Sequence, residues 1–165
     1  MKNVVLVLLV WLCCLTPIFI AGNRYGLLTV EAADRAYVEE EVVSLCNELR
    51  MEKGLSPFVH NWEAARVARY KTEDMKIHKY FNHDSPVYGS FFDMLKNFHI
   101  PYKSAGENIA MGFSTPQAVV DAWMASPSHR KNILSESFTQ AGVGYSTDGT
   151  VHYWALILLE PVSNI

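Results

Sequence analysis

The sequence is poor in cysteine, with three in 165 residues. Cys13 and Cys14 lie in the apolar N-terminal segment, so Cys46 alone remains in the rest of the chain. An intrachain disulfide in that part is therefore excluded, although the compartment can still be an oxidising one. Cys46 falls on the apolar face of an expected helix, and we interpret it as a small buried hydrophobe rather than a nucleophile.

Blocks of like charge are also missing. The 14 basic and 17 acidic residues give a net charge of −3, and no basic cluster stands out. This balance argues against a nucleic-acid partner, which would leave a basic footprint. An acidic tail and low-complexity runs are absent too, so most of the chain is expected to fold as one domain.

The N-terminus contrasts with the rest of the chain. After Lys2, residues 4–21 are apolar except for Thr16. We interpret residues 1–21 as a secretory signal peptide or a membrane anchor, and the sequence leaves both open. Residues 22–33 are expected to form a linker, and residues 34–165 the domain, outside the cytoplasmic membrane. Contact with the membrane is expected only through the N-terminal segment, if it is not cleaved.

Five helices are expected. Asp34 is the expected N-cap of the first, Gly54 its stop, Asn61 the N-cap of the second and Thr115 that of the fourth. The expected ranges are 34–53, 61–79, 90–98, 115–126 and a short turn at 129–134 with Ser128 as its cap. Each carries an apolar face at helical spacing or a proline or glycine at its boundary.

The last part of the chain changes to a period of two. Residues 141–145 and 151–159 read as strands, and Asp148-Gly149 marks a hairpin turn between them. Both faces of the second strand are apolar, so it is expected to be central and covered on both sides. The predicted fold class is α+β, a three-layer α-β-α sandwich with an antiparallel central sheet.

Three polar segments stand between these apolar elements. They are residues 83–86, 106–109 and 128–134, and they carry His83, Glu107 and His129. We expect the three side chains to line one cleft. Two histidines and a carboxylate can hold Zn²⁺ with an open fourth position, or move protons. The wide spacing alone does not decide between these roles, and the sequence has no HExxH, His-x-x-x-His or G-x-S-x-G motif.

Several short motifs occur in an order that resembles the CAP superfamily (cysteine-rich secretory proteins, antigen 5 and pathogenesis-related 1). The chain is similar in particular to the bacterial SCP-like extracellular proteins, over about residues 38–160. The motifs are Asn47-x-x-Arg50, Gly54-Leu55-x-Pro57, Met75, Phe81-Asn82-His83-x-Ser85-Pro86, Gly106-Glu107-Asn108-Ile109-Ala110, Ala122-Trp123-Met124, Ser128-His129-Arg130-Lys131-Asn132-Ile133-Leu134 and Gly142-Val143-Gly144-Tyr145.

The resemblance implies an α-β-α sandwich, a secreted setting and an open cleft lined by two histidines and acidic residues. His83, Glu107 and His129 match the family's motif positions. In some members the cleft holds a divalent metal such as zinc, for which His83 and His129 would be the ligands. The chain departs from the pattern at Ser126, a cleft position where eukaryotic members carry a second glutamate, and this weakens the expected metal site.

The function expected from these features is that of a secreted or surface-anchored binding module. Its cleft would take an extracellular small molecule, peptide, lipid or cell-wall component. Two alternatives stay open: an extracellular hydrolase that depends on a metal or on the His/Glu set, and a structural protein of envelope or spore-coat assembly. No residue is assigned a catalytic role.

Overall fold

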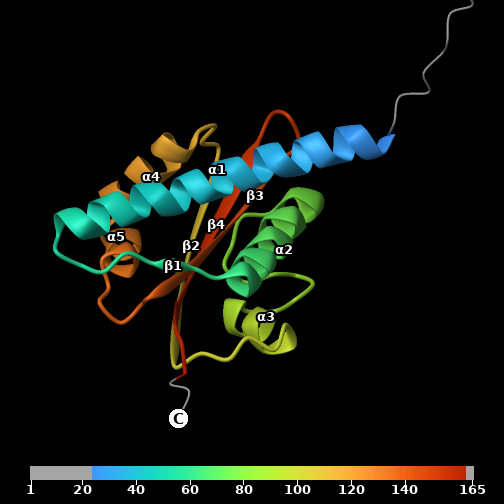
Figure 1. The fold of residues 1–165 in the computed structure, drawn as a ribbon. Coiled ribbons are helices and arrows are strands. Elements are labelled where there is room, and N and C mark those ends of the chain that lie inside the picture. The colour runs from blue at the N-terminus through green and yellow to red at the C-terminus, as the bar shows by residue number, and fades with distance from the viewer. Residues whose placement is uncertain (1–23, 163–165) are drawn as a thin grey trace, which may run out of the picture.

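A computed structural model describes the backbone of residues 24–162 and the side chains of residues 34–162 (Figure 1). The predicted signal peptide or anchor, residues 1–21, lies outside the described residues. Within residues 24–162, the elements in chain order are α1 (Arg24–Glu52), β1 (Val59–His60), α2 (Trp62–His78), α3 (Phe91–Asn97), β2 (Ser104–Met111), α4 (Pro116–Ala125), α5 (Pro127–Ile133), β3 (Gln140–Thr147) and β4 (His152–Glu160). No helix in this range is long and apolar enough to cross a bilayer.

The four strands form one sheet in the order β1-β3-β4-β2. β3 pairs with β4, and β4 with β2, in antiparallel register. The two residues of β1 pair with β3 in parallel. The sheet is therefore mixed, and the prediction of an antiparallel sheet was wrong at this edge. The long connection between β1 and β3, which includes α2, α3, β2, α4 and α5, provides the crossover that a parallel pair needs.

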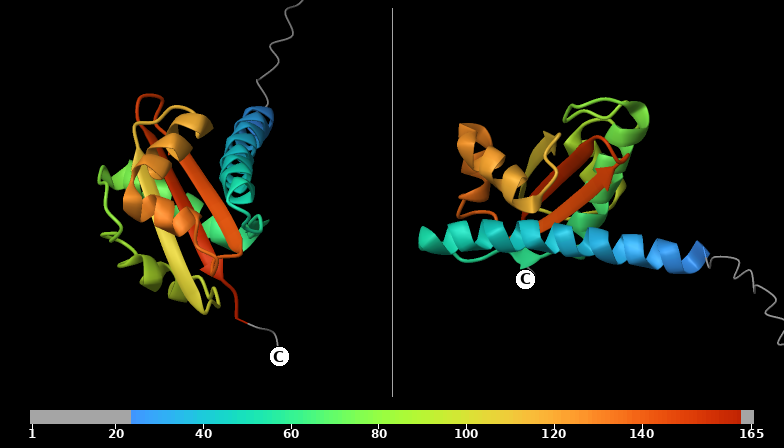
Figure 2. Two further views of the ribbon diagram at one scale, coloured as in Figure 1. Left: turned by 90° about the vertical axis from the view of Figure 1, so that its left-hand side faces the viewer. Right: turned by 90° about the horizontal axis from the view of Figure 1, so that it is seen from above.

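Helices cover both faces of the sheet, which confirms the three-layer α-β-α prediction. In Figure 2 the strands run between the green helices α2 and α3 on one side and α4 and α5, with α1, on the other. Side chains of β4 alternate between the two layers: Tyr153, Ala155 and Ile157 pack toward α2 and α3, and Trp154 and Leu156 toward α1 and α4. The last strand is thus central and doubly covered, as its sequence predicts.

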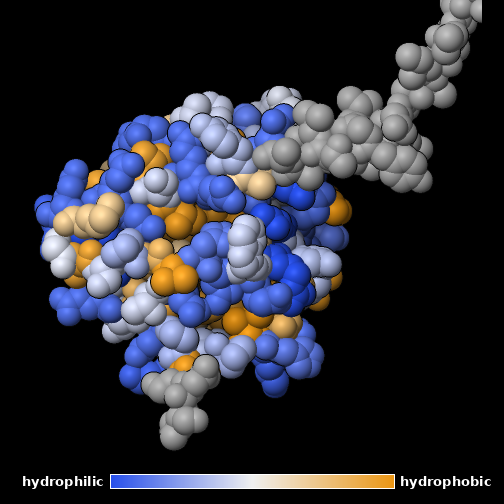
Figure 3. Space-filling view, in the orientation of Figure 1, coloured by the Kyte–Doolittle hydropathy of each residue, from blue (hydrophilic) through white to orange (hydrophobic). Residues whose placement is uncertain are grey.

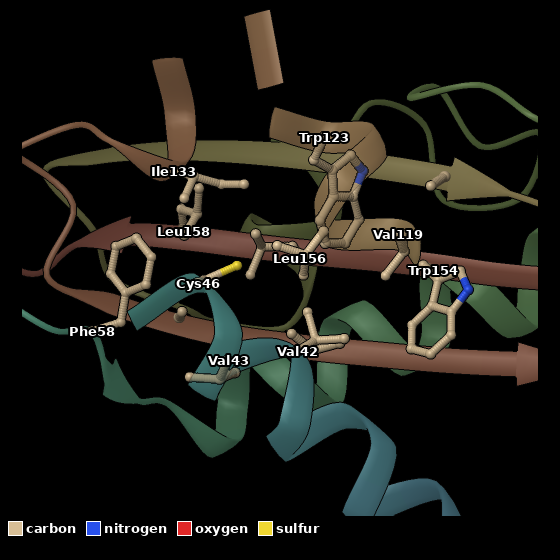
Figure 4. Packing of buried hydrophobic residues seen from close by; sticks show 14 of the residues in the cluster. Val42, Val43, Cys46, Phe58, Val119, Trp123, Ile133, Trp154, Leu156 and Leu158 are labelled. Carbon is tan, nitrogen blue, oxygen red and sulfur yellow. The ribbon is translucent and has the colours of Figure 1, made fainter. Parts of the chain in front are cut away.

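The core on the α1 side also contains Cys46, which is fully buried among Val42, Ile133 and Leu158 (Figure 4). Burial raises the pKa of its thiol to about 12, so the thiol stays protonated at neutral pH. The interpretation of Cys46 as a buried hydrophobe is confirmed. The surface seen in Figure 3 is mostly hydrophilic, with its hydrophobic residues in separate groups.

Two helix starts match their predicted caps, Asn61 and Thr115, and Ser90, the predicted first residue of the third helix, is also an N-cap. Asn61 Oδ1 accepts from the amide of Ala64, and Thr115 Oγ1 from that of Ala118. Ser90 and Asp93 form a reciprocal capping box at the start of α3. Each cap satisfies an amide that would otherwise lack a partner in the first turn.

Two other starts were predicted wrongly. α1 begins at Arg24, so Asp34 lies inside the helix and is not its N-cap, and the helix runs through most of the segment expected to be a linker. α5 begins at Pro127 with Ser126 as its N-cap, two residues before the predicted cap Ser128. Proline is favoured at the first position of a helix, because its missing amide is not needed there.

α2 packs against β3 at very short range. A Cβ atom at Gly142 would lie 2.1 Å from the amide nitrogen of Ala65, and one at Gly144 would lie 2.2 Å from the carbonyl carbon of Ala68. Both contacts are to backbone, which cannot move aside as a side chain can. The two glycines therefore fix how closely α2 lies on the sheet, and with it the position of the loop that follows α2.

Gly144→Ala is expected to lower the free energy of unfolding by about 3 kcal/mol or more, because α2 must move off the sheet to admit the methyl group. Gly149→Ala is the matched control. Gly149 faces open space and has a φ of 89°, so only backbone strain of about 1 kcal/mol is expected there. Chemical denaturation of both variants measures the difference, and equal losses would contradict the packing account.

Candidate functional site

His83 lies in the loop between α2 and α3, and this loop is ordered by its own hydrogen bonds. α2 ends at Lys79, which adopts a left-handed conformation with a φ of 53°. Asn82 Oδ1 then accepts from the amide of Asp84 at 3.0 Å. Ser85 exchanges two backbone hydrogen bonds with Gly89. These bonds hold His83 at a fixed point beside the sheet.

Asp74, on the inner face of α2, anchors the same loop. Its Oδ2 accepts from the hydroxyl of Ser85 at 2.6 Å and from that of Tyr80. The Ser85 oxygen in turn accepts from the amides of Val87 and Tyr88. The Ser85 hydroxyl therefore stabilises the turn at residues 85–88, and it is not free to act as a nucleophile.

Lys71 is a fully buried lysine directly under the loop. Its Nζ donates to the carbonyl oxygen of His83 at 2.7 Å and to the hydroxyl of Tyr80 at 3.2 Å. Burial lowers the pKa of this ammonium group, and the nearby carboxylates of Glu107 and Asp74 oppose that shift. The lysine thus fixes the backbone of His83 and partly compensates the buried acids around it.

The central contact of the site joins His83 to Glu107 on β2. His83 Nδ1 lies 2.5 Å from Glu107 Oε2. The carboxylate side chain is only 2% exposed, whereas the imidazole is 53% exposed. The hydrogen bond that His83 donates to this carboxylate raises the pKa of the imidazole. A buried acid therefore orients a histidine whose other ring nitrogen remains available to a ligand.

The second oxygen of Glu107 is unusual. Oε1 is buried and has no hydrogen-bond partner among residues 34–162. Leaving a carboxylate oxygen buried and unpaired carries a free-energy cost. A carboxylate with a purely structural role is expected to accept hydrogen bonds through both oxygens. The unpaired Oε1 therefore indicates that Glu107 has a functional role as well as a structural one.

His129 reaches the same region from the opposite layer. Asn108, the neighbour of Glu107 on β2, donates through Nδ2 to the carbonyl oxygen of His129 at 3.1 Å. Asn132 donates to Asn108 Oδ1 at 2.8 Å. Burial lowers the pKa of His129, and the positive charge of His83 lowers it further. The backbone of His129 is tied to the residue that follows Glu107 on the edge strand.

Ser126 stands apart from this contact network. Its hydroxyl lies 3.2 Å from that of Ser128, at the junction of α4 and α5, and it makes no side-chain cap hydrogen bond. Its place in the cleft stays a prediction.

The described residues do not form the zinc site of two histidines and one carboxylate that His83, Glu107 and His129 could provide. Within residues 34–162, no three histidine, cysteine, aspartate or glutamate side chains converge as the ligands of one ion. One oxygen of Glu107 accepts a hydrogen bond from His83. A carboxylate bonded in this way orients a histidine and does not itself bind the metal. Two imidazoles alone fall short of the three protein ligands of a typical catalytic zinc. Zinc binding through His83 and His129 stays a prediction.

Residues 43–158 match the family described as CAP, the cysteine-rich secretory protein family. The chain belongs to this family. The resemblance seen in the sequence is confirmed, and His83, Glu107 and His129 lie within the matched residues.

Two relatives of this CAP protein come from Bacillus subtilis. It is 52% identical over 113 residues to YkwD of Bacillus subtilis (strain 168), an alignment that covers 68% of this chain and 44% of YkwD. It is 37% identical over 120 residues to the membrane protein YlbC of the same organism, covering 70% of this chain and 35% of YlbC. The chain thus spans less than half the length of these relatives.

Solved structures show the same fold. An extracellular protein of Bacillus anthracis that contains an SCP domain superposes with a TM-score of 0.71 and is 33% identical, covering 76% of this chain and 41% of that one. A cysteine-rich secretory protein of Staphylococcus aureus gives a TM-score of 0.66 at 25% identity, covering 76% and 39%.

Sequence reasoning missed Lys71 as part of this CAP site. The signal was present, because Lys71 lies at i+7 from Ala64 and i+3 from Ala68, on the apolar face of α2. A lysine on an otherwise apolar helix face is rarely buried without partners. The sequence could therefore have predicted that Lys71 is buried beside acidic residues. It could not have predicted the hydrogen bond from Lys71 to the carbonyl oxygen of His83.

Glu107→Gln is expected to lower the pKa of His83, because the amide removes the charge that holds the imidazole protonated. The stabilisation from the pair is present below the ordinary histidine pKa, and it is lost as pH rises through the raised pKa of folded His83. Imidazole NMR titration of both proteins measures the shift. Glu63→Gln, an exposed carboxylate outside the site, should leave it unchanged. A His83 pKa unaffected by Glu107→Gln would contradict the contact.

Proposed function

We propose that this protein is an extracytoplasmic binding module whose cleft at the edge of β2 takes a polar ligand between His83 and His129. The observation that carries the proposal is the His83–Glu107 pair. A carboxylate that is almost fully buried holds an imidazole that is half exposed, so the histidine is oriented before a ligand arrives. Orientation in advance reduces the entropy lost on binding.

The groups around the pair favour binding over covalent chemistry. The hydroxyl of Ser85 is occupied by Asp74 and by two backbone amides. The thiol of Cys46 is buried in the opposite core and protonated. The Ser85 hydroxyl is buried and fixed by these hydrogen bonds, and the Cys46 thiol is buried and uncharged, so neither group is placed to attack a ligand in the cleft.

One observation favours a hydrolase as the second candidate. Glu107 raises the pKa of His83, whereas burial and the charge of His83 lower the pKa of His129. Two neighbouring groups with pKa values pushed apart can act as an acid and a base at the same pH. His83 would then donate a proton and His129 accept one.

The extracytoplasmic setting rests on the relatives. The Bacillus anthracis protein is described as extracellular, and YlbC as a membrane protein. The predicted signal peptide or anchor agrees with the same setting. A ligand from outside the cell, such as a cell-wall component or a peptide, follows from that placement.

His129→Ala is expected to weaken cosedimentation of the purified protein with insoluble peptidoglycan at least tenfold, because one wall of the cleft is lost. His99→Asn is the matched control, since His99 lies outside the cleft and asparagine tolerates its left-handed backbone. Unfolding temperatures should match within a few degrees.

The same samples, with and without Zn²⁺, are assayed for soluble products from peptidoglycan and casein. The binding proposal predicts no release of products. Release that His129→Ala abolishes would contradict it and support the hydrolase. Equal cosedimentation of all three proteins would contradict both functions for this cleft.

A further inference from the structure

A pocket of about 240 Å³ borders the His83–Glu107 pair. The loop after α2 contributes His83 and Asp84, the start of α3 contributes Phe91 and Phe92, and β2 contributes Gly106. The pocket is smaller than those that enclose drug-sized ligands, so it suits one small ring of a larger molecule.

Phe92 forms an exposed aromatic wall of this pocket. Its side chain is 54% exposed, whereas that of Phe91 beside it is buried. The ring lies 6.4 Å from that of Tyr102, at an interplanar angle of 33°. The capping box of Ser90 and Asp93 fixes the helix turn that carries Phe92. A large aromatic ring is thus held in water beside a polar cleft, where burial by a ligand would be favourable.

The polar side of the pocket offers two different hydrogen-bonding groups. His83 is bonded to Glu107 through Nδ1, and the rest of its half-exposed ring can face a ligand. The adjacent Asp84 is exposed, and its carboxylate accepts hydrogen bonds and repels anionic ligands. A neutral molecule with many hydroxyl groups can donate to Asp84 and bond to the second ring nitrogen of His83 at once.

We propose that this pocket binds one pyranose ring of an extracellular glycan, with the sugar's C–H face on Phe92 and its hydroxyl groups on His83 and Asp84. The inference rests on the proposed binding function and narrows the ligand from any extracellular molecule to a glycan. A sugar ring combines an apolar face with a polar edge, which matches a single aromatic wall beside a donor and an acceptor. A lipid chain would need an enclosed apolar cavity instead.

The test uses a chitin-type tetrasaccharide and a synthetic wall stem peptide as probes, each titrated into the full-length protein and followed by NMR. The tetrasaccharide is expected to shift the signals of His83 and Phe92. Phe92→Ala should raise its Kd at least tenfold, which corresponds to about 1.4 kcal/mol. Phe92→Tyr should keep the Kd within about twofold, because it retains the ring.

Trp62→Ala is the matched control, since Trp62 is 63% exposed and does not line this pocket. Its Kd should equal that of the wild type. A tetrasaccharide that binds equally to the wild type and to Phe92→Ala would overturn the glycan inference. If the stem peptide shifts His83 and the tetrasaccharide does not, the glycan inference fails while the binding function stands. If insoluble wall material itself does not bind through His129, the proposed function fails as well.

Discussion

The pleat of strand β2 is the constraint on which the site depends. Successive residues of a strand point to opposite faces of the sheet. Glu107 therefore meets the layer of α2 and α3, while Asn108 meets the layer of α4 and α5. Because β2 is an edge strand, groups from both layers contact it, the His83 side chain at Glu107 and the His129 carbonyl at Asn108. Eight paired positions with β4 fix the register. A slip by one residue would turn Glu107 toward α5 and separate it from His83.

The second requirement is the position of α2. Gly142 and Gly144 let its backbone lie directly on β3, and the loop that carries His83 begins where α2 ends. Lys71 and Asp74 then tie that loop back to the helix through His83, Ser85 and Tyr80. Buried charges of both signs are arranged in one network, so each offsets part of the cost of burying the others. The half-exposed imidazole of His83 is thus held in place by largely buried groups.

Much of the fold is readable from the sequence, because helix caps and turn residues act locally. Asn61, Ser90 and Thr115 predict three helix starts, and Asp148-Gly149 predicts the hairpin. β2 was not predicted, because Glu107 and Asn108 place two buried polar residues in the middle of the strand and break its apolar pattern. The two-residue β1 and its parallel pairing are too short to leave any pattern.

The site is only partly readable in the same way. His83, Glu107 and His129 stand out as polar residues between apolar elements, and the family resemblance implies that they share a cleft. The contact of His83 with Glu107 joins residues 24 apart, and it depends on strand register and on the packing of α2. No sequence motif specifies Lys71, Asp84 or Phe92. Their positions beside His83 become visible only in the structure, where α2, the loop after it and α3 lie against strand β2.

A ligand that binds between His83 and His129 must contact both imidazoles across β2. The imidazole NMR signals of the six histidines can be recorded during titration with solubilised cell-wall fragments. We expect the signals of His83 and His129 to shift together with the same apparent Kd, while those of His60, His78, His99 and His152 stay in place. Shifts of His83 and His129 with different Kd values, or shifts confined to the other four, would contradict this mode of binding.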